Sequence, residues 1–197
     1  MPDLVEPTAG SPLLAAHAHG QDRQPIQPLD DFYAREGRPL LPFSRIEGES
    51  IPEPYRTLLV HQRDMTRTLE HFHHGSIHLR VLSSRRESDN YWRESILQLD
   101  GSLRPIEYGA IKIYLGAVPE PGRSQILAEH LPLGGILNTN GIQYTSRPSA
   151  YFHCDPDSFI RAGFHLGRVS HLYGRQNTLR LIDGSLLAEI IEILPPV

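Results

Sequence analysis

The spacing of the hydrophobic residues changes at Gly75. Before this glycine, Met65, Leu69 and Phe72 recur at the period of an α-helix. After it, Ile77 begins a run in which apolar residues recur at every second position, as in a β-strand. Helical and strand-like segments form separate blocks and do not alternate along the chain. The sequence therefore predicts an α+β fold and argues against a Rossmann or TIM-barrel architecture.

The other segments extend this order along the chain. Helices are expected at residues 30–36, from residue 55, at 65–74 with Asp64 as the N-cap, at 123–130 and at 131–137. Strands are expected at residues 76–82, 91–99, 105–115, within 164–182 and at 186–194, while 144–156 shows no clear pattern. Together they predict an antiparallel sheet of about six strands with helices packed on one face.

Length and composition fit one globular domain. The chain has 197 residues, of which 39% are hydrophobic, and its first part is rich in Pro, Ala, Gly, His and Gln. We therefore expect a disordered N-terminal arm at residues 1–28 and a single domain at residues 29–197. The formal net charge of -4 argues against a nucleic-acid partner.

Cysteine content and hydropathy bear on location. Cys154 is the only cysteine, which fits a reducing compartment and excludes an internal disulfide. The sequence has no signal-peptide pattern and no apolar segment long enough to cross a bilayer. A cytoplasmic protein without a membrane partner is expected, while its oligomeric state is left open.

Arg93 stands out among the strand residues. It shares a face with Leu97 and Leu99, so if these leucines face a core or a pocket, the guanidinium does too. A buried arginine requires an anion. Its partner is either an internal carboxylate, such as Glu107 or Glu192, or a bound ligand.

The last strand carries two glutamates on opposite faces. Glu192 lies between Ile190 and Leu194, and Glu189 lies between Leu187 and Ile191. Burial among apolar neighbours raises the pKa of a carboxyl group, which suits a general acid or base. An exposed edge-strand glutamate is the alternative for either residue.

A metal site is not expected. His71, His73, His74 and His78 lie close in sequence, but Gly75 ends the helix before His78 and no acidic ligand stands among them. Imidazole is in any case favoured at a helix C-terminus by the helix dipole.

Several motifs occur together in an order that resembles the chorismate pyruvate-lyase (chorismate lyase, 4-hydroxybenzoate synthase) family. They are "DMTRTLEHF" followed by a strand, "RESILQLDG", "LPLGG", "LYGRQNTLRL" and a final strand with Glu192 before "ILP". The resemblance spans residues 58–195 and is loosest at 136–164. It implies a chorismate-lyase-like fold and a cofactor-independent carbon–oxygen lyase that eliminates pyruvate from chorismate to give 4-hydroxybenzoate. Such an enzyme serves aromatic or ubiquinone biosynthesis.

The resemblance also implies roles for individual residues. Arg93 matches the arginine that binds a ligand carboxylate, and Glu192 matches the glutamate that meets the ring hydroxyl, which makes these two the catalytic candidates. Met65 and Leu133, with Gly134 beside it, match the substrate-binding segment whose backbone N–H groups hold the ligand. The first N–H groups of a helix lack internal partners, so the amide of Met65 is available to an anion.

Other positions limit the resemblance. Arg175 in "LYGR" is a further candidate for substrate binding, with a solvent-exposed strand-end arginine as the alternative. Asp64 places a negative charge beside a carboxylate site, and Ile191 replaces the threonine of the family. Because the length of the final hairpin varies, Glu189 remains a rival to Glu192.

Three functional hypotheses follow. The first is a chorismate lyase. The second is a non-catalytic binder of an aromatic carboxylate that retains the arginine and the backbone amides. The third is a lyase-like enzyme that acts on a related enolpyruvyl or aryl acid. No metal or organic cofactor is implied by any of them.

Overall fold

The computed structural model describes residues 26–167 and 171–197. Residues 1–25 of the expected disordered arm at 1–28 therefore lie outside the described residues. Ile26 is 1% exposed and packs in the core with Leu29 and Phe32. The division into an arm and a single domain stays a prediction.

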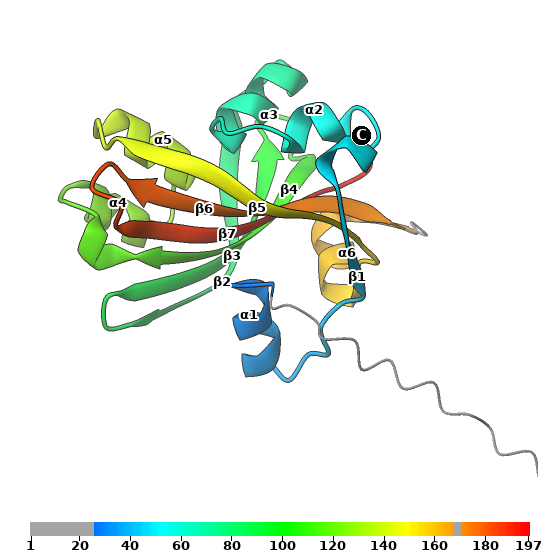
Figure 1. The fold of residues 1–197 in the computed structure, drawn as a ribbon, viewed down its shortest axis with the longest axis horizontal. Helices are drawn as coiled ribbons and strands as arrows, with labels where there is room; N and C mark the ends of the chain where they lie inside the picture. Colours follow the sequence, from blue (N-terminus) through cyan, green and yellow to red (C-terminus); the bar gives the residue numbers. More distant parts are fainter. Residues whose placement is uncertain (1–25, 168–170) are drawn as a thin grey trace, which may run out of the picture.

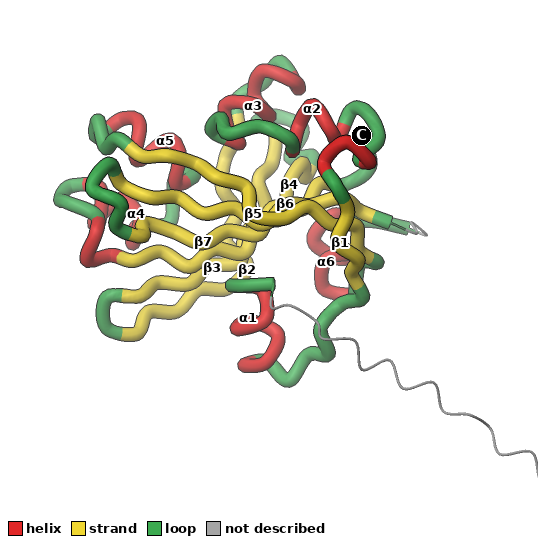
Figure 2. The backbone as a smooth tube through the Cα atoms, viewed as in Figure 1, coloured by secondary structure: helices red, strands yellow, loops and turns green. Residues whose placement is uncertain are grey.

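The architecture is α+β, as the sequence predicts. Seven strands form one antiparallel sheet in the order β1-β5-β6-β7-β4-β3-β2 (Figures 1 and 2). The strands are β1 (Phe43–Ile46), β2 (Ile77–Glu87), β3 (Asn90–Leu99), β4 (Pro105–Tyr114), β5 (Tyr144–Cys154), β6 (Leu172–Leu181) and β7 (Leu186–Leu194). β5 occupies the segment that shows no clear sequence pattern, and the strand-like run at 164–182 divides between the end of a helix and β6.

The helices are short. They are α1 (Leu29–Arg35), α2 (Tyr55–Leu59), α3 (Met65–His73), α4 (Gly122–Ala128), α5 (Leu133–Thr139) and α6 (Ser158–Phe164), with single 3-10 turns at Gly48–Ser50 and Leu115–Ala117. No helix in the described part of the chain is long and apolar enough to cross a membrane.

The start of α3 follows the sequence prediction. The Oδ1 atom of Asp64 accepts a hydrogen bond from the Arg67 amide at 2.8 Å, as an N-cap does. The helix ends at His73, and His74 takes the left-handed conformation with φ 52° one residue before the predicted stop at Gly75.

Strand alternation gives the sheet two different faces. One face, called the pocket face here, carries Arg93, Leu97 and Ile111, and α2, α3, α4 and α5 lie against it (Figure 1). The opposite face packs against α1 and α6, with Trp92 and Ile191 in its core. As predicted, the two glutamates of β7 lie on opposite faces. Glu192 lines the cavity on the pocket face, and Glu189 accepts a hydrogen bond from the Tyr114 hydroxyl at 2.7 Å on the other.

Candidate ligand-binding pocket

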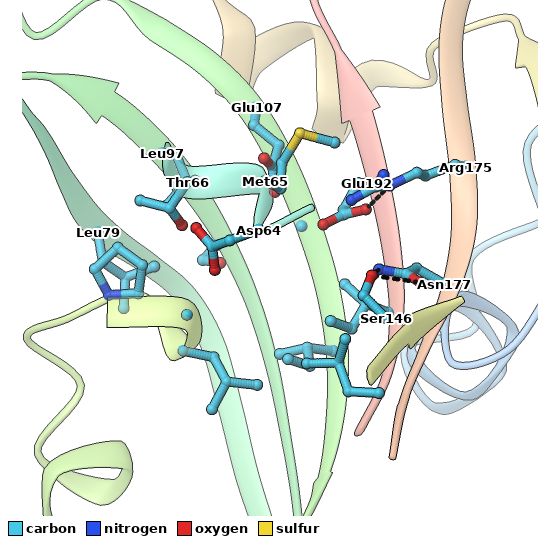
Figure 3. A pocket seen from close by; sticks show the side chains of 18 of the residues that line it. Asp64, Met65, Thr66, Leu79, Leu97, Glu107, Ser146, Arg175, Asn177 and Glu192 are labelled. Carbon is cyan, nitrogen blue, oxygen red and sulfur yellow. Dashed lines mark hydrogen bonds and ion pairs between the residues drawn. The ribbon is translucent and has the colours of Figure 1, made fainter. Parts of the chain in front are cut away.

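A cavity lies between the pocket face and the N-terminal ends of α3 and α5 (Figure 3). Its volume is about 70 Å³. All the residues predicted for the site line this one cavity, namely Met65, Arg93, Leu133, Gly134, Arg175 and Glu192. The structure therefore brings together segments that are more than a hundred positions apart in the sequence. The ligand-contacting roles of these residues stay predictions.

Arg93 is one of three arginines that line the cavity, with Arg63 and Arg175. It is 3% exposed, and it forms no ion pair with any residue that the structure describes. Its Nε and Nη1 atoms are buried and have no hydrogen-bond partner. Burial lowers the pKa of Arg93, while the nearby Tyr91 and Glu129 act in the opposite direction. The internal carboxylate partner that the sequence left open is therefore absent for this guanidinium.

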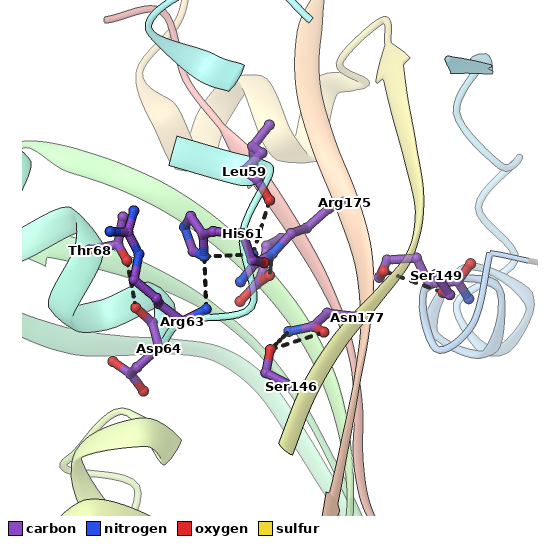
Figure 4. A network of polar contacts seen from close by, with 11 residues as sticks. Leu59, His61, Arg63, Asp64, Thr68, Ser146, Ser149, Arg175 and Asn177 are labelled. Carbon is purple, nitrogen blue, oxygen red and sulfur yellow. Dashed lines mark hydrogen bonds and ion pairs between the residues drawn. The ribbon is translucent and has the colours of Figure 1, made fainter. Parts of the chain in front are cut away.

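Glu192 is paired with a different arginine. It forms an ion pair with Arg175, its register neighbour on β6, and the two residues are 4% and 0% exposed. The solvent-exposed strand-end position considered for Arg175 is therefore wrong. The Nη1 atom of Arg175 also donates to the carbonyl oxygens of Leu59 and His61 at 3.0 Å each (Figure 4). Arg175 thus ties the segment between α2 and α3 to the sheet.

His61 in that segment is neutral at physiological pH. Burial, followed by the charge of Arg175, lowers the pKa of His61 to about 4. Its Nδ1 atom accepts a hydrogen bond from the Arg63 amide at 3.2 Å (Figure 4). The neutral ring therefore helps to shape the chain just before Asp64, at the mouth of the cavity.

Glu107 on β4 also lines the cavity, and sequence reasoning missed it as a site residue. It is 6% exposed, and its Oε2 atom is buried with no hydrogen-bond partner. Burial and then the charge of Glu192 raise the pKa of Glu107 well above its usual value. The available signal was its position two residues before Gly109 and four before Ile111, which places all three on one face.

Asp64 stands at the mouth of the cavity. Its Oδ2 atom accepts a hydrogen bond from the Tyr144 hydroxyl at 3.1 Å, which joins the start of α3 to the start of β5. A Cβ atom on Gly134 would lie 1.8 Å from this oxygen, so the carboxylate occupies space that only a glycine leaves free. Beyond Asp64 lies a wider groove of about 920 Å³ between α3 and the α5–β5 connection. Asp64 and Tyr144 line both spaces and so separate the inner cavity from the outer groove.

A neutral pair completes the polar lining. The Asn177 side-chain amide donates to the Ser146 hydroxyl at 3.0 Å, and the two residues come from neighbouring strands (Figures 3 and 4). Neither residue was singled out from the sequence. Both are buried, and their hydrogen bond satisfies these two uncharged polar groups within the protein.

The histidines near α3 do not converge. His78 contacts Asp100 through Nδ1 at 2.8 Å, and His73 contacts Arg104 at 3.0 Å. Within residues 26–167 and 171–197, no group of three or more His, Cys, Asp or Glu side chains is placed to hold a metal ion.

Comparison with known proteins gives no sequence match. The chain matches no protein-family model, and no curated protein is similar to it in sequence. Solved structures do share its fold. PhnF from Mycobacterium smegmatis superposes with a TM-score of 0.53 at 11% identity, over 68% of this chain and 64% of the PhnF chain. The effector domain of the same protein gives a TM-score of 0.50 at 11% identity, over 66% of this chain and 87% of that domain.

A further solved structure shows a weaker likeness, on which no conclusion is based. A GntR-family transcriptional regulator from Bacillus cereus is 13% identical over 61% of this chain and 92% of its own, with a TM-score of 0.43. The chain spans slightly less than two thirds of the full PhnF chain. At these identities the likeness establishes the fold alone.

The functional expectation from the sequence resemblance is wrong. The solved structures that share the fold with a TM-score of at least 0.50 are PhnF and its effector domain, not lyases. This corrects the predicted membership of the chorismate pyruvate-lyase family, the elimination of pyruvate from chorismate and the place in aromatic or ubiquinone biosynthesis. The lyase-like sheet with its helices is present, but a shared fold does not carry a reaction with it. Of the three hypotheses, the non-catalytic binder agrees best with these neighbours.

Proposed function

We propose that this chain is a non-catalytic ligand-binding domain that recognises a small aromatic carboxylate through Arg93. The observation that carries the proposal is the state of the Arg93 guanidinium. It is 3% exposed, has two nitrogen atoms without partners and faces a cavity. A ligand carboxylate would supply the missing anion.

The energetics of burial support this assignment. A charged side chain removed from water without a partner costs several kcal/mol, and structures retain such groups mainly where function requires them. The planar guanidinium fork fits a carboxylate through two parallel hydrogen bonds. Arg93 is therefore ready to bind an organic acid without first breaking an internal ion pair.

The rest of the cavity favours an apolar body on that acid. The apolar walls of the cavity are formed by Leu79, Leu97, Ile111, Leu133 and Leu179. Met65 is buried beside them, and its thioether packs favourably against aromatic rings. A ring bearing one carboxylate combines the two properties that this lining selects.

Binding without catalysis fits the arrangement of the acids. The Glu192 carboxylate is engaged by Arg175, which also holds the segment between α2 and α3. The likeness to the effector domain of PhnF supports ligand binding as the role of the fold. Because the alignment leaves part of the PhnF chain uncovered, the proposal is confined to ligand binding.

Calorimetric titration with benzoate tests the proposal. We expect saturable binding at one site, and a loss of at least about 2 kcal/mol of binding free energy in Arg93→Gln. Arg85→Gln is the matched control, because Arg85 lies over the Trp92 ring on the opposite face at 3.7 Å. Absence of binding, or equal binding by Arg93→Gln and wild type, contradicts the proposal.

A further inference from the structure

Glu107 differs from the other buried glutamates of the sheet. Glu94 accepts hydrogen bonds from Arg38, Ser83 and Tyr108, and Glu192 is paired with Arg175. Glu107 makes no ion pair in the described part of the chain, and its buried Oε2 atom has no hydrogen-bond partner. A buried polar atom without a partner is rare in folded proteins and calls for an explanation.

The charges around Glu107 leave it short of a cation. Glu192 on β7 and Asp64 before α3 bear on it as acids, and Arg175 on β6 is the only base among the groups that affect its ionisation. Arg175 is already paired with Glu192. Two carboxylates therefore share one guanidinium, and burial and the charge of Glu192 raise the pKa of Glu107, which favours its protonated form.

A protonated carboxyl group has an O–H to donate. The Nη2 atom of Arg175 is a second buried donor without a partner in the same cavity. This end of the cavity thus lacks a hydrogen-bond acceptor, whereas the other end, at Arg93, lacks an anion. The two ends require chemically different groups.

Strand register sets the distance between these ends. Arg93 pairs with Ile111, and Leu97, four residues further along β3, pairs with Glu107. Four residues of strand place the two positions about 13 Å apart along the sheet. Gly109 lies between them in the floor of the cavity, and a Cβ atom there would be in van der Waals contact with Oε1 of Glu107, at 3.4 Å. Figure 3 shows Glu107 and Glu192 entering the cavity from neighbouring strands.

We propose that Glu107 is a specificity-determining residue that contacts a neutral oxygen of the ligand, a hydroxyl or a carbonyl, at the end of the cavity remote from Arg93. The ligand is then an aromatic acid with one carboxylate and, across the ring, one neutral hydrogen-bond acceptor. This inference rests on the proposed function and adds the second recognition point to it. An acid of the same size that lacks the oxygen leaves the Glu107 O–H buried and unpaired, so it binds more weakly.

The experiment uses pairs of probes of matched size. 4-Hydroxybenzoate is compared with 4-methylbenzoate, and 3-hydroxybenzoate with 3-methylbenzoate, by calorimetric titration at neutral pH. In at least one of the two pairs, the wild-type protein is expected to bind the hydroxy acid about tenfold or more tightly than the methyl acid of the same pair. Glu107→Leu is expected to reduce this ratio to about one, mainly by weakening the hydroxy acid. Glu107→Gln keeps an N–H donor and is expected to retain most of the preference.

Two further variants serve as a replacement and as a control. Glu107→Met is a second apolar replacement in case Glu107→Leu does not fold. Glu189→Gln makes the same chemical change as Glu107→Gln on the opposite face, where Glu189 accepts from Tyr114, and should leave both affinities unchanged.

The possible outcomes separate the two proposals. If none of the acids binds, or if they bind Arg93→Gln as well as wild type, the proposed function fails and this inference fails with it. If they bind through Arg93 but the hydroxy-to-methyl ratio is the same in wild type, Glu107→Leu and Glu107→Met, the role of Glu107 is refuted while carboxylate binding stands.

Discussion

Arg93 and Glu94 are neighbours on β3, yet their charges meet different surroundings on the two faces of the sheet. Glu94 on the opposite face is fully buried and accepts hydrogen bonds from Arg38 at 2.8 Å, Ser83 at 2.8 Å and Tyr108 at 2.6 Å. Arg93 on the pocket face is almost as buried but has no ion-pair partner among the residues described. The first charge is satisfied within the protein, and the second is not.

The difference separates groups that hold the fold together from groups available to a ligand. Satisfied buried charges rigidify a core, and removing one partner leaves the others stranded. Unsatisfied buried groups weaken the free protein and are relieved when a ligand supplies the missing partner. On this view Glu94 is structural, and Arg93 gives up stability for binding.

Removing the charge of Glu94 should have the largest effect on stability. Glu94→Gln keeps the shape but removes the buried carboxylate that accepts hydrogen bonds from Arg38, Ser83 and Tyr108. The half-buried Arg38 guanidinium is then left with Glu36 as its carboxylate partner, and we expect the free energy of unfolding to fall by about 3 kcal/mol. Urea denaturation measures this change. Glu189→Gln, on the same face, is the control and should cost about 1 kcal/mol or less. Equal losses in the two variants would remove the structural role assigned to Glu94.

The next largest effect is expected at the mouth of the cavity. Gly134→Ala places a methyl group against the Asp64 carboxylate, which must move and give up its hydrogen bond with Tyr144. We expect a loss of about 2 kcal/mol in thermal or urea unfolding. Gly135→Ala is a closely matched control, because a Cβ atom there meets nothing within 4 Å and alanine favours the helix. If both variants are equally stable, Asp64 is not held against α5.

Glu107 should give the pocket face a distinct pH dependence. Its folded-state pKa is raised above the unfolded value of 4.5, so the native state binds a proton that the unfolded chain releases. The contribution of Glu107 to stability is therefore complete below the unfolded pKa and is lost as the pH rises toward the folded pKa. The slope is at most about 1.4 kcal/mol per pH unit.

Glu107→Gln removes this titration. The difference in unfolding free energy between wild type and Glu107→Gln, measured at several pH values from the mildly acidic to the neutral range, should change in favour of the variant as the pH rises. Glu189→Gln, which leaves Glu107 in place, is the control. Parallel curves for wild type and Glu107→Gln would show that Glu107 does not retain its proton in the folded state.

The sequence predicts features of the fold and the site that depend on neighbouring residues better than those that depend on residues far apart in the chain. Strand alternation placed Arg93 on the face of Leu97 and separated Glu192 from Glu189, because side-chain direction is a local property of a strand. β5 was not recognised, since Pro148 and a register shift beside it interrupt the alternation.

The sequence did not predict which buried carboxylate pairs with which arginine. Glu107 and Glu192 were equally plausible partners for Arg93, and neither is its partner. Glu192 pairs with Arg175 because β6 and β7 set those two residues side by side, and the register between strands is a tertiary property. The motifs of the lyase resemblance predicted the fold correctly and the reaction wrongly, since the same sheet can hold different chemistry.

Removing the charge of Arg93 should have the smallest effect on stability and the opposite sign to that of Glu94→Gln. Arg93→Met replaces an unpaired buried cation by an apolar side chain of similar length, so the ligand-free protein should gain about 1 kcal/mol in urea unfolding. The same variant should lose the stabilisation that saturating benzoate gives to wild type, which is about 2.7 kcal/mol at a hundred times the dissociation constant. A destabilisation as large as that of Glu94→Gln would mean that Arg93 is held by the fold itself. In that case both buried charges, Arg93 and Glu94, would stabilise the fold, and the two faces of β3 would not differ in this respect.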